Sequence, residues 1–168
     1  MGEVPRLDLG RLIAELRNSS VQYVAIGGIA ALALDLPVPA TVDLDITPMR
    51  SRENYKHLSD FFRVTDAKLF TSQDGGTWFP HQLIDNWSQY DTLHLLTKFG
   101  LLDIVFSPEG APHGYRQLFK NSLIANLGSE SFRSISEQQW VALKHATGRD
   151  KDLEHLAVYF QQRKNSEN

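Results

Sequence analysis

The chain has 168 residues, of which 42% are hydrophobic and 22% charged, and its formal net charge is −3 at pH 7. These values are typical of a soluble globular protein with a single domain and a sizeable core, and they exclude a global basic field for binding nucleic acid. The absence of cysteine excludes disulfides, thiolate metal sites and a cysteine nucleophile.

The amino-terminal residues, MGEVPRLDLG, lack the charged-then-apolar layout of a signal peptide. No apolar run approaches the roughly 20 residues that are needed to span a bilayer. We therefore expect a cytoplasmic location and no membrane partner.

The first predicted helix covers residues 8–18, where apolar residues recur at helical spacing behind the cap residue Asp8. Residues 21–26 then form a β-rich run, Gly27-Gly28 interrupts it, and residues 29–34 continue as a short apolar helix. The glycines leave room for a ligand close to the backbone, and the helix start behind them offers free N–H groups to a phosphate.

A second strand is predicted over residues 42–47, with Asp43 and Asp45 on one face and Val42, Leu44 and Ile46 on the other. Side chains two apart on a strand lie roughly 7 Å from each other. Two carboxylates at this spacing repel each other unless something positive lies between them. The pattern therefore suits a hard divalent cation with oxygen ligands.

After a predicted helix over about residues 51–61, capped by Ser51, the pattern weakens. Residues 63–90 contain a turn signal at Asp74-Gly75-Gly76 and many aromatic rings. Two interpretations of these rings stay open: packing in a core or loop, or a base-stacking wall beside an active site. The aromatic segment comprises Trp78, Phe79, Pro80, His81 and Trp87.

Residues 93–96 and 101–106 are strand-like runs joined by the short turn of residues 97–100. Asp103 lies inside the second run among apolar residues, where an acid is costly unless it is paired or bound to metal. The alternative is that Asp103 caps a turn at the strand end.

The remaining chain is predicted to form a short helix near residues 115–119, strands at 122–127 and 132–135, and two helices. Ser136 caps the first of these helices and Gly148 ends it, while residues 149–152 begin the second. The last eight residues are predicted to fray. We expect one α+β domain, with a sheet core over about residues 8–135 and C-terminal helices over about 136–164.

These motifs, in this order, resemble the DNA polymerase β-like nucleotidyltransferase superfamily. The likeness is greatest to small bacterial nucleotidyltransferases related to the AbiEii and MenT toxins. It rests on the Gly27-Gly28 turn, on the Asp43-Leu44-Asp45 strand with Thr41 before it, and on the C-terminal segment ISEQQWVALKHATGRDKDLEHL. Together these motifs cover most of the chain.

The resemblance implies a mixed β-sheet flanked by helices and a metal-dependent enzyme. Asp43, Asp45 and Asp103 would be the catalytic and metal-binding acids, holding Mg²⁺ or Mn²⁺, with Asp103 as a candidate general base. The implied nucleotide-binding residues are Gly27, Gly28, Thr41, Lys144, Arg149, Lys151 and Asp152. Taken without the resemblance, Lys144 would instead be a solvated surface lysine.

The implied reaction transfers a nucleoside monophosphate from a nucleoside triphosphate to a hydroxyl of tRNA, a protein or a small molecule. Resemblance to toxin–antitoxin relatives favours a tRNA 3′ end or a protein, and a cognate antitoxin or toxin as partner. The chain departs from the family pattern at Asp35-Leu36, at Pro39 in place of an arginine, and at His155 in place of an aspartate.

Two other hypotheses stay open from the sequence. The first is a catalytically degenerate nucleotide- or partner-binding module of the same fold. The second is a structural domain in which the acids only cap turns. The six histidines show no H-x-x-x-H or H-E-x-x-H spacing, which argues against a histidine-based zinc site.

Overall fold

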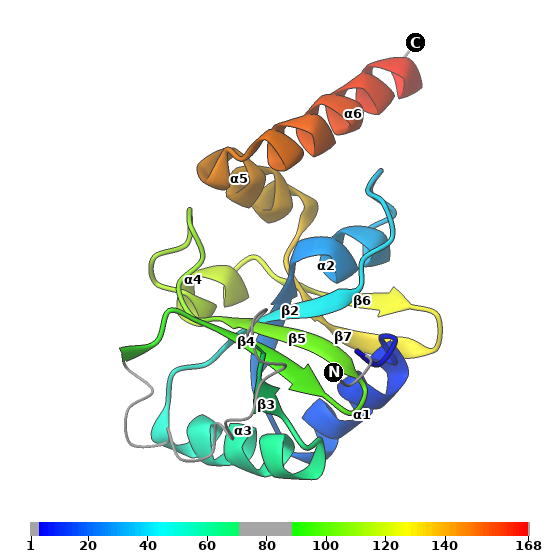
Figure 1. Ribbon diagram of the computed structural model, residues 1–168. Helices are drawn as coiled ribbons and strands as arrows, with labels where there is room; N and C mark the ends of the chain where they lie inside the picture. Colours follow the sequence, from blue (N-terminus) through cyan, green and yellow to red (C-terminus); the bar gives the residue numbers. More distant parts are fainter. Residues whose placement is uncertain (1–3, 71–88, 168) are drawn as a thin grey trace.

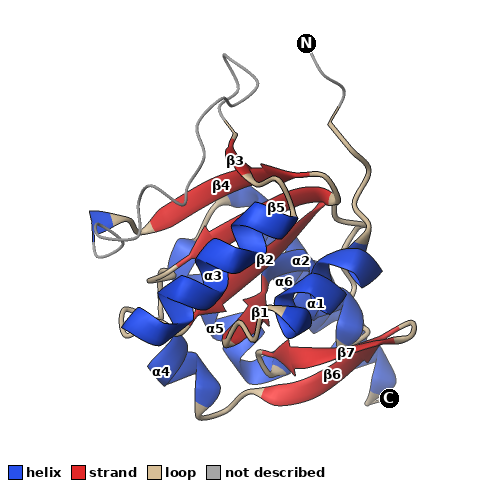
Figure 2. Ribbon diagram, turned by 90° about the horizontal axis from the view of Figure 1, so that it is seen from below, coloured by secondary structure: helices blue, strands red, loops and turns tan. Residues whose placement is uncertain are grey.

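The computed structural model describes residues 4–70 and 89–167. The described residues form an α+β fold, in which a mixed sheet of seven strands is flanked by helices on both faces (Figures 1 and 2). In chain order the elements are α1 (Leu9–Asn18), β1 (Tyr23–Ile26), α2 (Gly27–Ala33), β2 (Asp43–Pro48), α3 (Arg52–Val64), β3 (Lys68–Leu69), β4 (Thr92–Thr97), β5 (Gly100–Val105), α4 (Tyr115–Phe119), β6 (Leu123–Leu127), β7 (Glu130–Ser134), α5 (Glu137–Thr147) and α6 (Asp150–Ser166).

The strands are ordered β3-β4-β5-β2-β1-β7-β6 across the sheet. β2 runs parallel to β5, β1 runs parallel to β7, and the other neighbouring strands are antiparallel. β2 therefore lies between β5 and β1, two strands that are separated from each other by 73 residues or more in the chain. This arrangement places the two acids of β2 in the middle of the sheet.

Each face of the sheet is covered by its own set of helices, and Figure 2 shows α1 and α3 in front with α5 and α6 behind. Helices α1 and α3 bury the apolar stripes that the sequence predicts for them, since residues three and four apart lie on one helix face. The buried residues of these stripes are Leu12, Ile13, Leu16, Leu58, Phe61 and Phe62. On the other face, α2, α5 and α6 bury Ala30, Ala31, Trp140 and Leu156.

The predicted helix caps are confirmed. The side chains of Asp8 and Ser51 each accept a hydrogen bond from the backbone N–H three residues later. Ser136 forms a full capping box at the start of α5, and Gly148 ends that helix in the left-handed conformation at φ 58°.

Several predicted boundaries are wrong. Val42 is 70% exposed and lies outside β2, because the ladder with β5 begins only at Asp43. α2 begins at Gly27 rather than at residue 29, and β3 was not predicted. The tail predicted to fray is instead helical as far as Ser166.

The length of α6 has a local cause. Tyr159 and Arg163 both donate hydrogen bonds to the Glu137 carboxylate at the start of α5, so the second half of α6 is held against its neighbour.

The predicted Asp74-Gly75-Gly76 turn and the aromatic segment of residues 78–81 and 87 lie outside the described residues. Within residues 4–70 and 89–167, none of the helices combines the length and the apolar character that a bilayer span requires.

Candidate active site

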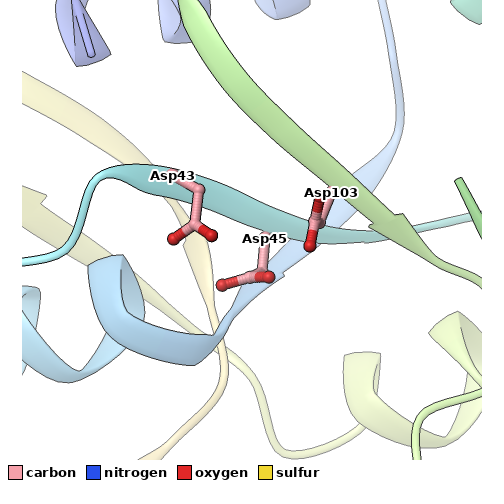
Figure 3. A group of neighbouring side chains, drawn as sticks. All are labelled: Asp43, Asp45 and Asp103. Carbon is pink, nitrogen blue, oxygen red and sulfur yellow. The ribbon is translucent and has the colours of Figure 1, made fainter. Parts of the chain in front are cut away.

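Three carboxyl groups converge on one side of the sheet (Figure 3). Asp43 and Asp45 lie on β2, and the parallel register with β5 places Asp103 directly beside Asp45. One carboxylate oxygen from each residue lies within 4.8 Å of the other two. The acids therefore lie within strands and face one another, which argues against the hypothesis that they cap turns.

The electrostatics of this group are unfavourable without a cation. Burial, reinforced by the carboxylates of Asp43 and Asp103, raises the pKa of Asp45 to about 7. Burial also raises the pKa of Asp103, although a hydrogen bond from His94 opposes that shift. The charges of Lys144 and Arg149 lower the pKa of Asp45, but by less than burial and the two acids together raise it.

The two glycines of the first motif give the acids room. A Cβ atom on Gly27, whose φ is +67°, would lie 2.2 Å from Oδ2 of Asp45. A Cβ atom on Gly28 would lie 2.8 Å from Cβ of Thr41. Thr41 in turn donates a hydrogen bond of 2.7 Å from its hydroxyl to Oδ1 of Asp43. Gly27, Gly28 and Thr41 thus position the carboxylates, whereas their predicted contact with phosphate stays a prediction.

We expect Gly27→Ala to weaken metal binding sharply, because the new methyl group occupies the place of the Asp45 carboxylate. Gly128→Ala is the matched control, since Gly128 also has a left-handed φ, +60°, but has nothing within 4 Å of the added Cβ. Both variants incur backbone strain of about 1–2 kcal/mol. Mn²⁺ titration and urea unfolding of both variants separate the two effects. Equal metal affinity in the two variants would contradict this account of Gly27.

His94 is a site residue that the sequence analysis missed. Its Nδ1 lies 2.9 Å from Oδ1 of Asp103, and its side chain is 62% exposed. The signal was present in the sequence: the two-residue turn between β4 and β5 pairs Thr97 with Gly100 and therefore His94 with Asp103.

A second cluster, which we call the Asp152 cluster, joins α5 to α6. The buried Asp152 carboxylate accepts hydrogen bonds from Nζ of Lys144 at 2.6 Å, from Oγ1 of Thr147 at 2.6 Å and from Nε of Arg149 at 2.7 Å. Lys144 is only 16% exposed, so it is not the solvated surface lysine that its sequence alone would suggest. Thr147 is a further residue that the sequence analysis missed.

The Asp152 cluster carries two cations and one carboxylate, and it acts on the acids of the sheet. The charges of Lys144 and Arg149 both lower the pKa of Asp45, against the larger effect of its burial. Burial and the charge of Lys144 hold the pKa of His155 below its usual value, so this ring adds no stable positive charge. Lys151 is exposed on the first turn of α6 and lies outside the cluster.

The three acids fit a hard divalent cation. Their donors are all carboxylate oxygens, which suit Mg²⁺ and Mn²⁺ rather than softer metals. Oxygens on one octahedral Mg²⁺ lie at most about 4.2 Å apart, so small side-chain rotations would bring the three acids onto one ion. Such an ion would also offset the repulsion that raises the pKa of Asp45.

The arrangement of the elements is shared with a solved structure. A crystal structure of a proposed nucleotidyltransferase (TM1012) from Thermotoga maritima matches 92% of this chain and 91% of that chain, with a TM-score of 0.55 and 16% sequence identity. The chain has a nucleotidyltransferase fold. No protein-family model and no curated protein matches the sequence.

The expected fold class is thereby confirmed. A likeness at 16% identity establishes the fold alone, so the activity has to be argued from the site. The AbiEii- and MenT-like subfamily stays a prediction.

Proposed function

We propose that this protein is a metal-dependent nucleotidyltransferase. The observation that carries the proposal is the position of Asp43, Asp45 and Asp103 on two adjacent strands. The charges of Lys144 and Arg149 reach this group, because they lower the pKa of Asp45. A site with converging carboxylates on one side and fixed cations on the other suits a metal-bound triphosphate, since each side neutralises part of it.

The proposed reaction forms a bond between an acceptor hydroxyl oxygen and the α-phosphorus of a nucleoside triphosphate, and breaks the bond from that phosphorus to the β-phosphate. Pyrophosphate leaves, and the hydroxyl proton passes to a base, for which we propose Asp103. Asp43, Asp45 and Asp103 would hold Mg²⁺ or Mn²⁺, which polarises phosphoryl oxygens and lowers the pKa of the attacking hydroxyl.

The other residues of the site bind and orient the substrate in this proposal. Lys144 and Arg149, held by Asp152, would bind the triphosphate and offset the charge that develops on pyrophosphate. Gly27 lies against Asp45 and Gly28 against Thr41, and the backbone N–H groups of the two glycines would contact the phosphates. Thr41 holds the Asp43 carboxylate in place.

For the acceptor we propose a hydroxyl of a tRNA 3′ end or of a protein, with a small molecule as the third class. This choice, and a cognate antitoxin or toxin as partner, rest on the resemblance to AbiEii and MenT toxins. Because the net charge is −3, a tRNA acceptor would have to be held by a local basic patch.

A second candidate is a nucleotide- or partner-binding module without catalysis. Two observations favour it: Pro39 stands where the family has an arginine, and the ammonium of Lys144 is already engaged by Asp152. In this alternative the chain binds nucleotide and metal but transfers nothing.

Isothermal titration of each nucleoside triphosphate, with and without Mg²⁺, tests the site. We expect binding that depends on Mg²⁺ in the wild type and is lost in Asp43→Ala/Asp45→Ala, because that variant lacks two of the three carboxylates. Asp60→Ala, which removes an exposed acid of α3, is the control and should bind like the wild type. Failure of every nucleoside triphosphate to bind at millimolar concentration would contradict the proposed enzymatic activity. A partner-binding module would then be the remaining candidate.

A further inference from the structure

Helix α6 is left largely uncovered by the rest of the protein. Of its 17 residues, Asp152 and Leu156 are the two that are buried. Figure 1 shows α6 running outward past α5, with its C-terminal end away from the sheet. The exposed side nevertheless carries large apolar residues, since Leu153, Val158 and Phe160 are 48%, 47% and 43% exposed.

Five exposed residues form one line along this helix, which we call the α6 stripe: Asp150, Leu153, Ala157, Phe160 and Lys164. They are spaced by three or four residues, so they lie on one face. The stripe has an acid at its first end, a base at its last end, two large apolar residues between them and an alanine at the centre. Such a stripe differs from a solvated helix face, which is polar throughout.

The α6 stripe is complementary to itself when a second helix runs antiparallel. With Ala157 opposite Ala157 of the other helix, Asp150 lies opposite Lys164 at both ends. Leu153 then lies one residue, about 1.5 Å along the axis, from the level of Phe160, which is close enough for the two side chains to pack. The small alanine lets the two backbones approach closely at the crossing point. Glu154 and Gln161 are exposed as well, and in this register they also lie within one residue of each other's level.

We propose that α6 pairs antiparallel with α6 of a second copy of this chain, through the α6 stripe, to form a two-fold symmetric dimer. A two-fold interface requires one patch that complements itself, and the stripe meets this requirement in both charge and apolar contacts. A different protein would not need the acid and the base to be symmetric about Ala157. Phe160 and Lys164 also line a hollow of about 720 Å³ beside α6.

Charge exchange at the two ends of the stripe tests the proposal. Asp150→Lys and Lys164→Asp should each weaken the dimer about tenfold, because each places like charges opposite each other at both ends. The double variant Asp150→Lys/Lys164→Asp should regain most of the loss. Within one helix these residues are 14 positions or about 21 Å apart, so only pairing between two chains explains such a rescue.

Sedimentation equilibrium over a range of concentrations measures these effects, and circular dichroism checks that each variant keeps its helix content. A monomeric wild type would overturn the proposal, and so would a dimer that the single exchanges do not weaken or the double exchange does not restore. The first outcome would turn attention to a different protein as the occupant of the stripe.

Cross-linking provides an independent measurement, because the chain has no cysteine of its own. A single thiol at the centre of the stripe, Ala157→Cys, should give a covalent dimer with a short bismaleimide. Gln162→Cys is the matched control, since Gln162 is exposed on α6 but lies off the stripe. Equal cross-linking of the two variants would overturn the antiparallel register.

Discussion

Replacing Asp152 with alanine is expected to lower the free energy of unfolding by about 3–5 kcal/mol, since it leaves the largely buried Lys144 without its counter-charge. Burial alone would raise the pKa of Asp152, but the hydrogen bonds from Arg149, Lys144 and Thr147 hold that pKa well below its usual value. The lowered pKa means that this stabilisation is present above about pH 4 and is lost as the pH falls further. Urea unfolding at neutral pH measures the effect.

A double variant separates the lost ion pair from lost packing. Asp152→Asn/Lys144→Met removes both charges while keeping similar volumes, so it should be more stable than Asp152→Ala. A loss of less than about 1 kcal/mol in Asp152→Ala would contradict the role of the Asp152 cluster in joining α5 to α6.

Asp45→Asn is expected to stabilise the metal-free protein at pH 8, by up to about 4 kcal/mol. The pKa of Asp45 is raised to about 7 in the folded protein, mainly by burial and then by Asp43 and Asp103. A raised pKa stabilises the folded protein, and this contribution is fully present below about pH 4, the pKa of the carboxyl group in the unfolded chain. It is lost as the pH rises through 7. The asparagine side chain does not titrate in this pH range, so the variant does not lose stability in this way.

Thermal unfolding of the wild type and Asp45→Asn between pH 5 and pH 8 measures the difference. The comparison with the variant is needed because His155, whose pKa is lowered, acts in the opposite direction. Mg²⁺ should raise the midpoint of the wild type at pH 8 and leave that of Asp45→Asn nearly unchanged. Parallel pH profiles for the two proteins would show that Asp45 is not held in a repulsive cluster.

Much of the site could be predicted because its residues follow one another along short stretches of chain. The alternation around Asp43 and Asp45 places both acids on one face of a strand without any knowledge of the tertiary fold. Asp103 stood out because an acid among apolar strand residues needs a compensating partner. That Asp103 joins Asp43 and Asp45 came from the resemblance, whereas the parallel register of β2 with β5 that brings it beside Asp45 appears only in the structure.

Other features depend on tertiary contacts that local patterns do not encode. Lys144 and Asp152 lie on different helices, and their pairing is set by how α5 packs on α6. The predicted contact of the two glycines with phosphate stays a prediction, and the structure adds that a side chain at Gly27 would collide with Asp45. The helical end of α6 was missed because its polar composition is typical of a frayed tail, and contacts to Glu137 hold it in place.

The most direct test of nucleotidyl transfer uses two labels on the same nucleoside triphosphate, one on the α-phosphate and one on the γ-phosphate. The protein is incubated with each form, with Mg²⁺ and with RNA, protein and small-molecule fractions of a bacterial extract, beside Asp103→Asn as the inactive control. We expect the α-label to enter one fraction only with the wild type and Mg²⁺, and the γ-label to enter none. Transfer of the γ-label, or retention of the α-label in free nucleotide in every fraction, would contradict nucleotidyl transfer by this protein.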